Sequence, residues 1–267
     1  MSVPGSPSPE AADLAARKGF GRLEHTFLPR KELDVRDGRR GLFMAGAIAG
    51  TAALGAGGVL LWTSYSRILA LYPLFLTVLA VGALVKSPNF RRKVAGRRLH
   101  LFEQGLLVDS GGGRLFALRW EHAVHYQATV QEVIEYKGTT TPFKTSHVST
   151  LVAPDGTRFD VTDSFADHGT WLPLIGEAIA RAQAQRVWDA VRGGRKAAHG
   201  PFTLDATGIS STRGGTLSWS EVEAVDVSGG AVIVRRAGQP KPWARAEVKT
   251  VPNLLLFLTL AARLRRA

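Results

Sequence analysis

The chain has 267 residues and no cysteine, and its 34 Lys and Arg outnumber its 22 Asp and Glu to give a formal net charge of +12. The lack of cysteine excludes disulfide bonds and thiolate metal sites, and it fits a reducing compartment. The positive charge is compatible with nucleic acid, but no zinc finger, helix-turn-helix or RNP-like motif accompanies it, so we expect no nucleic-acid partner.

Residues 1–40 predict a polar, partly disordered N-terminal segment on the cytoplasmic side. The first ten residues are rich in Pro and Ser and bury too little apolar surface to offset the entropy of ordering. Ala11 to Phe20 then show a short helical pattern. Two interpretations stay open for this pattern: an amphipathic segment on a membrane surface, or a marginal helix with no partner.

Two apolar stretches without a charged side chain, residues 41–63 and 68–85, predict a transmembrane hairpin spanning residues 41–85. A helix needs roughly 20 apolar residues to cross a bilayer, a length that the first stretch exceeds and the second just reaches. Only residues 64–67 separate the stretches, so both flanks must lie on the same side of the bilayer. The alternative is a pair of buried helices in a large soluble core.

Basic residues flank the hairpin on both outer sides and predict its orientation. Five lie between Arg30 and Arg40 and six between Lys86 and Arg98, whereas the turn carries only Arg67. Because short basic loops resist translocation, we expect both termini in the cytoplasm and the protein in the cell membrane. Residues 86–98 form a basic juxtamembrane linker, in which the predicted membrane-surface contacts are Arg91, Arg92, Lys93, Arg97 and Arg98. These side chains either anchor the hairpin or bind anionic lipid headgroups.

Gly46 and Gly50 form a Gly-x-x-x-Gly pattern on the first stretch. Such a pattern lets a neighbouring helix approach closely. The expected partner is the second span of the same chain, with homodimerisation as the alternative.

Residues 99–194 predict a first unit of short antiparallel strands closed by a helix. Alternating apolar runs are separated by turns rich in glycine or containing Asp-Gly, as in a meander. The strands are expected at 99–101, 105–108, 116–120, 130–136, 147–153 and 157–162. Apolar residues then recur at helical spacing from Leu172 to Val191, and the glycines that follow are typical of a helix end.

Residues 199–267 predict a second, shorter unit of the same kind. Its strands are expected at 202–204, 208–211, 216–219, 222–227, 231–235 and 244–248. A terminal helix is expected to begin near Pro252-Asn253, and its apolar core is about half the length that a membrane span needs, so we predict a packed helix. Whether the two units are separate domains or lobes of one body stays open.

An internal repeat relates the two units. Gly105 is followed by a Leu-x-Trp-x-x motif at Trp120, and Gly208 by the same motif at Trp219. We expect the two glycines to serve the turn between two strands, and the two tryptophans to supply large core contacts at strand ends.

These motifs resemble those of bacterial pleckstrin-homology-like (PH-like) domains, small meanders with one closing helix, and the Pro252-Asn253 entry to the last helix resembles them too. The combination of basic linker, two spans and such domains is similar to uncharacterised actinobacterial membrane families of unknown function. The resemblance covers residues 99–267. It implies an α+β fold: a two-helix transmembrane hairpin followed by tandem antiparallel β-meander units, each closed by a C-terminal helix.

No constellation of catalytic or metal-binding residues stands out. His122 and His125 would lie on opposite faces of a strand, as would Glu132 and Glu135, which argues against shared metal ligation and against an acid/base pair. No helix N-terminus is expected after the glycine run 111–113, as a phosphate loop would require. We therefore assign no catalytic, cofactor-binding or metal residue and expect neither an enzyme nor a cofactor.

The sequence favours a non-catalytic integral membrane protein that presents its cytoplasmic module to an unknown protein or peptide partner. Exposed sheet edges of such modules accept a partner strand through main-chain hydrogen bonds. Two alternatives stay open: a module that binds anionic lipid headgroups, and a membrane-bound enzyme.

Overall fold

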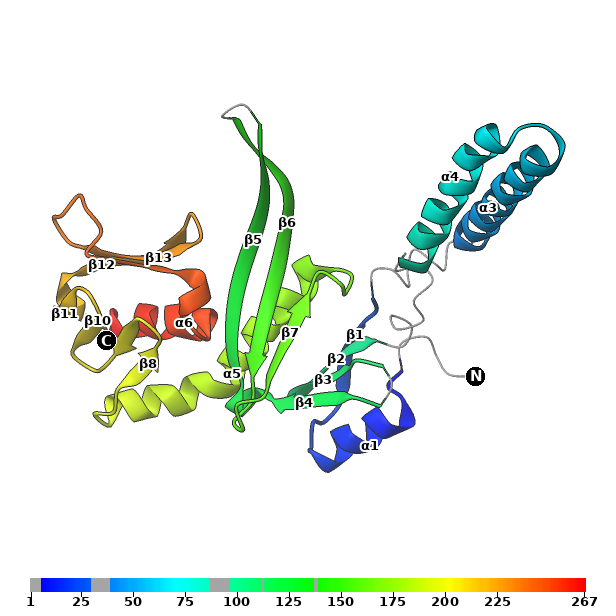
Figure 1. Cartoon of the computed structure of the whole chain (residues 1–267). Coiled ribbons are helices and arrows are strands. Elements are labelled where there is room, and N and C mark those ends of the chain that lie inside the picture. The colour runs from blue at the N-terminus through cyan, green and yellow to red at the C-terminus, as the bar shows by residue number, and fades with distance from the viewer. Residues whose placement is uncertain (1–5, 30–38, 87–96, 112, 137–138) are drawn as a thin grey trace. The chain divides into compact units, whose positions relative to one another are not determined.

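The computed structural model describes residues 6–29, 39–86, 97–111, 113–136 and 139–267 (Figure 1). Contacts within the chain define two compact units. The helical hairpin unit is Leu28–Arg97, and the β-rich unit combines Met1–Phe27 with Arg98–Ala267. The β-rich unit is therefore built from two chain segments that lie on either side of the hairpin in the sequence.

The helical hairpin unit consists of α3 (Arg39–Ser64) and α4 (Arg67–Lys86). Within them, Ala45–Ser64 and Arg67–Val85 are long and apolar enough to cross a membrane, and only 6% of each segment is buried in the structure. Most of their large apolar side chains are exposed, unlike those of core helices in a soluble protein. The two predicted apolar helices are thus confirmed as helices.

The two helices pack through small residues near their turn. A Cβ added to Gly58 would lie 2.9 Å from the Leu74 side chain, one added to Gly55 would lie 3.4 Å from Thr77, and Ala70 is fully buried. Close approach of the backbones at glycine is the usual basis for such pairing.

The first half of the β-rich unit contains two antiparallel sheets and one helix. The first sheet has the order β1-β2-β3-β4, with β1 at Leu23–Phe27, β2 at Arg98–Phe102, β3 at Gly105–Asp109 and β4 at Leu115–Arg119. The second has the order β5-β6-β7, with β5 at Val124–Tyr136, β6 at Thr139–Val152 and β7 at Arg158–Thr162. The one-turn helix η2 (Trp120–His122) joins the sheets, and α5 (His168–Arg192) follows.

The second half repeats this order of elements. One sheet has the order β11-β10-β9-β8, with β8 at Ala197–His199, β9 at Phe202–Leu204, β10 at Gly208–Ser211 and β11 at Gly215–Ser218. The other has the order β12-β13-β14, with β12 at Val222–Ser228, β13 at Ala231–Arg236 and β14 at Ala244–Glu247. The one-turn helices η3 (Trp219–Glu221) and η4 (Val248–Thr250) precede β12 and α6 (Leu254–Leu264), respectively. The α+β class is confirmed.

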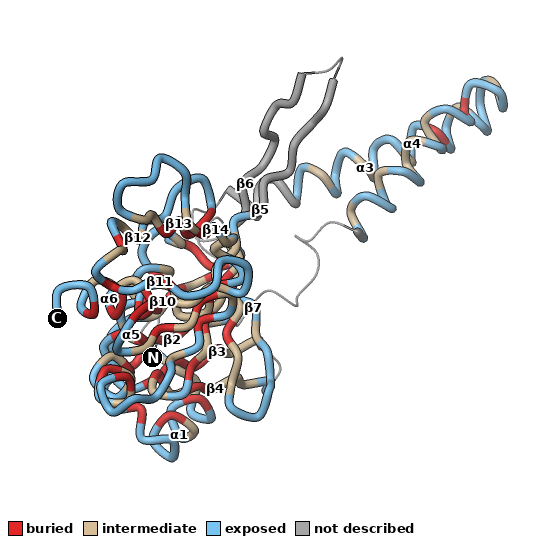
Figure 2. The backbone as a smooth tube through the Cα atoms, turned by 90° about the vertical axis from the view of Figure 1, so that its left-hand side faces the viewer, coloured by how far each residue is buried: buried red, intermediate tan, exposed pale blue. Residues whose placement is uncertain are grey.

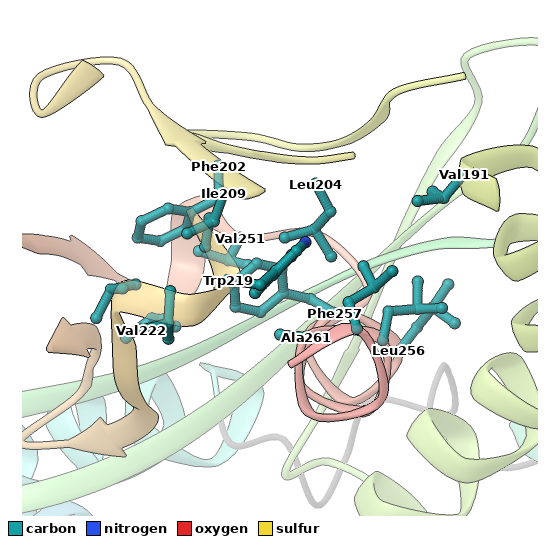
Figure 3. Packing of buried hydrophobic residues seen from close by; sticks show 14 of the residues in the cluster. Val191, Phe202, Leu204, Ile209, Trp219, Val222, Val251, Leu256, Phe257 and Ala261 are labelled. Atoms are coloured by element: carbon teal, nitrogen blue, oxygen red, sulfur yellow. The ribbon is translucent and has the colours of Figure 1, made fainter. Parts of the chain in front are cut away.

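Each half has its own apolar core under its helix. In the first, Trp171, Ile175 and Ile179 of α5 pack among the inward residues of both sheets. In the second, Phe257 and Leu256 of α6 are buried among strand residues (Figure 3). Figure 2 shows buried positions along the backbone of α6. Strands β2 and β3 are buried at nearly every position and do not alternate, because apolar residues cover both faces of the first sheet.

The N-terminal helix α1 (Pro9–Arg17) covers the other face of the first sheet. Its Ala11 and Ala15 are buried with Phe20 against Phe102 and Leu107. Both interpretations offered for residues 11–20, a membrane-surface segment and a helix without a partner, are therefore wrong. The short helical pattern is confirmed as a helix, and the partner of this helix is a protein surface.

Strand β1 belongs to the first sheet although residues 28–97 separate it from β2. It pairs antiparallel with β2, with Phe27 opposite Leu99 and Thr26 opposite His100. The sequence pattern places this segment outside the β units and does not predict β8. Both strands are short, and Phe27 is the only buried residue of β1, so neither strand carries a strong periodic signal.

The repeat glycines are required by close backbone contact. A Cβ on Gly105 would lie 2.6 Å from the carbonyl oxygen of Leu118, and one on Gly208 would overlap the carbonyl oxygen of Leu217. Both glycines begin a strand directly after the preceding turn. Glycine is therefore required at both positions because the neighbouring strand approaches closely. This reason adds to the turn that the sequence predicted.

The repeat tryptophans occupy equivalent places in the two halves. Each begins a one-turn helix after the last strand of a four-stranded sheet, and each is buried. The indole Nε1 of Trp120 donates to the carbonyl oxygen of Phe102 at 2.9 Å, and that of Trp219 donates to the carbonyl oxygen of Asp205 at 2.9 Å. The sequence repeat therefore corresponds to a repeat in local geometry.

Candidate functional site

A groove of about 1190 Å³ in the described part of the β-rich unit is the first candidate site. One wall is formed by β5 around Gln127 to Thr129, and another by β14 together with η4. The loops 211–214 and 227–230 and the segment Pro242-Trp243 complete the lining. The groove thus lies between two strands that are each the outermost strand of a three-stranded sheet.

The outer edge of β14 offers unpaired main-chain groups to the groove. β14 pairs with β13 through Ala244 and Ala246, and the N–H of Val248 continues this pattern by donating to the carbonyl oxygen of Gly230 at 3.0 Å. In an antiparallel pair the residues between these positions point their N–H and C=O away from the partner strand. The main-chain groups of Arg245 and Glu247 therefore face the open edge.

One of these outward groups already has a partner. The hydroxyl of Thr250 donates to the carbonyl oxygen of Glu247 at 2.7 Å. Two N–H donors and one carbonyl acceptor, from Arg245 and Glu247, are left for another strand. Their spacing is that of a strand edge.

The outer edge of β5 is arranged in the same way. Its first outward residue, His125, is paired with Asn253: the N–H of Asn253 donates to the carbonyl oxygen of His125 at 2.8 Å, and the N–H of His125 donates to the Asn253 side-chain oxygen at 2.8 Å. By the same alternation, Gln127 and Thr129 are the next residues that face outward. Both line the groove.

The side chains around the groove carry an excess of positive charge. Arg213, Arg245 and Lys249 line it, against the single carboxylate Glu247. The ammonium of Lys249 lies 2.6 Å from that carboxylate and holds the pKa of Glu247 below its usual value. Glu247 is therefore already paired, which leaves two guanidinium groups for an acidic ligand.

Apolar surface is available in the same groove. The ring of Trp243 lies against Gly214, where a Cβ would approach the ring to 3.3 Å. Leu172 and Leu254 line the groove as well. The groove can thus accept an extended segment that carries both apolar and acidic side chains.

The membrane-surface residues predicted in the linker lie partly outside the described residues. Arg91, Arg92 and Lys93 fall in 87–96 and so lie outside them. Arg97 is exposed, and Arg98 is the first residue of β2. Arg97 and Arg98, the two that the structure describes, are not among the residues that line the groove.

Gly46 and Gly50 do not contact α4. A Cβ added to either would meet nothing within 4 Å, whereas Gly55 and Gly58 do face α4. The expectation that Gly46 and Gly50 pack against the second helix of the same chain is therefore wrong. Their use in homodimerisation stays a prediction.

A serine and a histidine lie within hydrogen-bond distance of each other, but neither is accessible. The Nε2 atom of His125 lies 2.6 Å from the hydroxyl of Ser149. Both side chains are buried, and neither lines either of the cavities described for this chain. A nucleophile and base must reach a substrate, so this pair is better explained as a satisfied core contact.

The predicted histidine pair is separated by its secondary structure. His122 ends η2 and is exposed, whereas His125 lies on β5 and is buried. Among the residues that the structure describes, no group of three or more His, Cys, Asp or Glu is arranged to hold a metal ion. His147 and His168 stack with ring centroids 4.7 Å apart, a contact between β6 and α5 that the sequence did not reveal.

No local pattern in the sequence indicates the groove. The sequence predicts β14 as a strand, but nothing in it marks that strand as an edge or shows that β5 lies across from it. The nearest hint was the interruption Gln239-Pro240-Lys241-Pro242-Trp243 before β14, because prolines precede edge strands more readily than central ones.

A family model with the description "Family of unknown function (DUF6585)" matches residues 11–267 of the chain. The match includes the helical hairpin unit and both halves of the β-rich unit. No match was found among curated proteins or among solved structures.

Proposed function

This chain belongs to the DUF6585 family, a family of unknown function, and we propose that it is a non-catalytic, membrane-anchored adaptor that binds an extended peptide segment of a partner protein. The observation that carries the proposal is the groove between β5 and β14, where two strand edges present outward main-chain groups.

The two halves of the β-rich unit are best interpreted as tandem PH-like lobes. Each combines a four-stranded sheet, a three-stranded sheet and one closing helix in the same chain order. The equivalent positions of Trp120 and Trp219 support a shared ancestry of the lobes. In this interpretation the hairpin is an insertion between the first and second strands of the first lobe.

The exposed apolar surface of α3 and α4 supports insertion of the hairpin in a bilayer. Pairing of β1 with β2 supports a hairpin whose two flanks lie on the same side, because one sheet contains the residues before and after it. The basic residues on both flanks favour the cytoplasmic side of the cell membrane.

Strand addition accounts for both features of the groove. An extended peptide that adds to a sheet edge gains affinity from main-chain hydrogen bonds and specificity from pockets for alternate side chains. Arg213 and Arg245 favour acidic side chains, and Trp243 favours apolar ones. The proposed ligand is therefore a peptide in which acidic and apolar residues alternate.

A proline at position 247 tests this mode of binding. Glu247 has φ −65° and ψ 137°, a conformation that proline adopts without strain, and the residue before it is in a strand, as proline requires. Glu247→Pro therefore removes one outward N–H and leaves the fold intact. Glu247→Ala is the matched control, because it removes the same side chain and keeps the N–H.

The experiment uses the full chain in lipid nanodiscs and a phage-displayed library of random 12-residue peptides. Peptides enriched on the wild-type protein are synthesised and titrated by fluorescence anisotropy. We expect Glu247→Pro to bind the selected peptides about tenfold more weakly, or weaker still, because a main-chain hydrogen bond is lost and the register of the added strand is disturbed. Glu247→Ala should bind as tightly as wild type or tighter, because it removes the only carboxylate of the groove.

Two results would contradict the proposal. One is equal affinity of Glu247→Pro and Glu247→Ala for the selected peptides when both variants melt within a few degrees of wild type. The other is a selection that enriches no peptide on the wild-type protein.

A further inference from the structure

A second cavity of about 450 Å³ lies away from the peptide groove, where the end of α5, strand β8 and the start of α6 meet. We call it the basic pocket. Its lining residues are Val124, Gln183, Arg186, Val187, Ala190, Arg195, Lys196, Ala197, Ala198, His199, Pro252, Asn253 and Leu256. None of them lines the peptide groove.

Among the residues that the structure describes, three cations line this pocket and no carboxylate does. They are Arg186, Arg195 and Lys196. A cavity with one sign of charge concentrates counter-ions of the opposite sign. The pocket therefore favours an anion.

The three cations differ in how the fold holds them. Arg186 is fixed, because its guanidinium Nη2 donates to the carbonyl oxygen of Glu121 at 2.6 Å. Arg195 and Lys196 follow the glycine turn that ends α5, where the N–H of Arg195 donates to the carbonyl oxygen of Ala190 at 2.9 Å. After this turn come Arg195 and Lys196, which line the pocket, and then β8 begins at Ala197.

Arg195 and Lys196 are exposed, and the ion pairs identified among the described residues include neither of them. Lys196 helps to lower the pKa of the Asp205 carboxyl, but Asp205 does not line the pocket. The carboxylate of Asp205 already accepts hydrogen bonds from Thr207 and from the N–H of Gly208. Both cations are thus available to a ligand.

The inner wall of the pocket is apolar or neutral. Val187 and Leu256 line it, and His199 is buried at its base with Nδ1 donating to the carbonyl oxygen of Pro252 at 3.1 Å. Burial keeps the pKa of His199 below its ordinary value, so this imidazole is neutral near pH 7. A ligand here meets charge at the rim and apolar surface inside.

We propose that the basic pocket binds a phosphate monoester that carries an apolar group. The doubly charged phosphate matches the cations at the rim, and guanidinium groups bind phosphate oxygens in a bidentate manner. The apolar group packs against Val187 and Leu256. A cavity of this volume is in the range that holds small organic ligands. This site is independent of the peptide groove.

The test measures binding of phenyl phosphate to the full chain in phosphatidylcholine nanodiscs by isothermal titration calorimetry. We expect wild type to bind, and Arg195→Gln with Lys196→Gln in one chain to bind at least tenfold more weakly. The exchange Arg195→Lys with Lys196→Arg keeps both charges, one guanidinium and one ammonium, and should bind phenyl phosphate more tightly than the double Gln variant does. Inorganic phosphate should bind more weakly than phenyl phosphate, because it lacks the apolar group.

A matched control comes from the other cavity. Arg213→Gln with Arg245→Gln removes the same number of charges from the peptide groove and should leave the affinity for phenyl phosphate unchanged. Equal weakening by both double variants would mean that net charge alone attracts the anion, and it would overturn the proposal. So would absence of binding to wild type, or equal affinity of wild type and the Arg195→Gln, Lys196→Gln variant.

The source of the phosphate is decided by changing the nanodisc lipid. Phosphatidic acid carries a phosphate monoester, whereas phosphatidylglycerol is anionic but carries a diester. If membrane headgroups fill the pocket, phenyl phosphate should bind several-fold more weakly in phosphatidic acid discs than in phosphatidylglycerol discs. If the natural ligand is soluble, the two lipids should give the same affinity. Either result supports recognition of the phosphate monoester and assigns its source.

Discussion

Three buried histidines make the β-rich unit sensitive to acid at the scale of single residues. His100 and His125 are almost completely buried, and each has one polar partner: the hydroxyl of Thr26 lies 2.9 Å from the Nδ1 atom of His100, and that of Ser149 lies 2.6 Å from the Nε2 atom of His125. Burial lowers the pKa of both imidazoles from 6.5 to about 4. His199 is shifted in the same direction by burial.

These shifts predict that stability falls as the pH drops below 6.5. The unfolded chain binds protons on these histidines below pH 6.5, whereas the folded chain binds them only near pH 4, so the stabilisation is complete above pH 6.5 and is lost progressively between these values. His100 and His125 should each contribute a slope of up to about 1.4 kcal/mol per pH unit in this range.

Urea unfolding of the full chain in detergent micelles, followed by tryptophan fluorescence between pH 4.5 and 8, measures this slope. His125→Gln keeps a polar side chain that does not titrate, and it should flatten the slope by about one proton. His122→Gln, at an exposed position, is the control and should leave the slope unchanged. A stability that is constant from pH 7 to pH 5 would contradict the prediction.

At the scale of elements, the helical hairpin shows that glycines of one helix can face different surfaces. Gly55 and Gly58 face α4, whereas Gly46 and Gly50 leave room on another face of α3. The sequence identifies small residues on a helix but does not show which of them meets the neighbouring helix. Helix packing is therefore sensitive to substitution at position 58 and tolerant at position 46.

Gly58→Leu should separate the two helices, because even its Cβ would lie 2.9 Å from the Leu74 side chain and 3.3 Å from the Leu74 backbone nitrogen. Since the chain has no cysteine, a disulfide between Gly55→Cys and Thr77→Cys reports the packing without interference. We expect this crosslink to form readily in the otherwise wild-type chain and several-fold less in the Gly58→Leu background. Gly46→Leu is the control and should leave the crosslinking yield unchanged. Equal crosslinking yields in the wild-type and Gly58→Leu backgrounds would refute this packing.

At the scale of the whole molecule, Asn253 joins the two halves of the β-rich unit. It lies at the entry to α6 with φ 51°, in the left-handed region, and continues the edge of β5 by pairing with His125. Its side-chain amide also donates to the carbonyl oxygen of Ala123 at 3.1 Å and to the Gln183 side chain at 3.2 Å. Gln183 in turn donates to Ala123 and Trp120 in the first half.

Asn253→Gly should therefore destabilise the β-rich unit as a whole. Glycine tolerates the positive φ, so the substitution isolates the loss of the side chain, which leaves the N–H of His125 without its acceptor. An unsatisfied buried group of this kind costs about 1–3 kcal/mol. Asn253→Asp, which keeps the acceptor, should lose less. Chemical unfolding of the two variants against wild type measures the difference, and a Gly variant as stable as wild type would show that other contacts join the halves.

The sequence predicted much of the fold because several signals are local. The helix α5 and strands such as β10 and β13 follow from hydrophobic periodicity and from turn residues within a few positions. The two apolar helices follow from length and composition alone. Long-range placement was missed where the local signal was short, as for β1, whose partner β2 lies beyond residues 28–97.

The sequence by itself determined which segments form strands and apolar helices, where turns fall, and that an internal repeat exists. Only the tertiary structure decided that α1 covers a sheet, that β5 and β14 leave their edges open across one groove, and that Arg186, Arg195 and Lys196 surround one pocket. The reason is that periodicity reports which side chains are buried, whereas the groups left for a ligand depend on which elements become neighbours after the chain has folded.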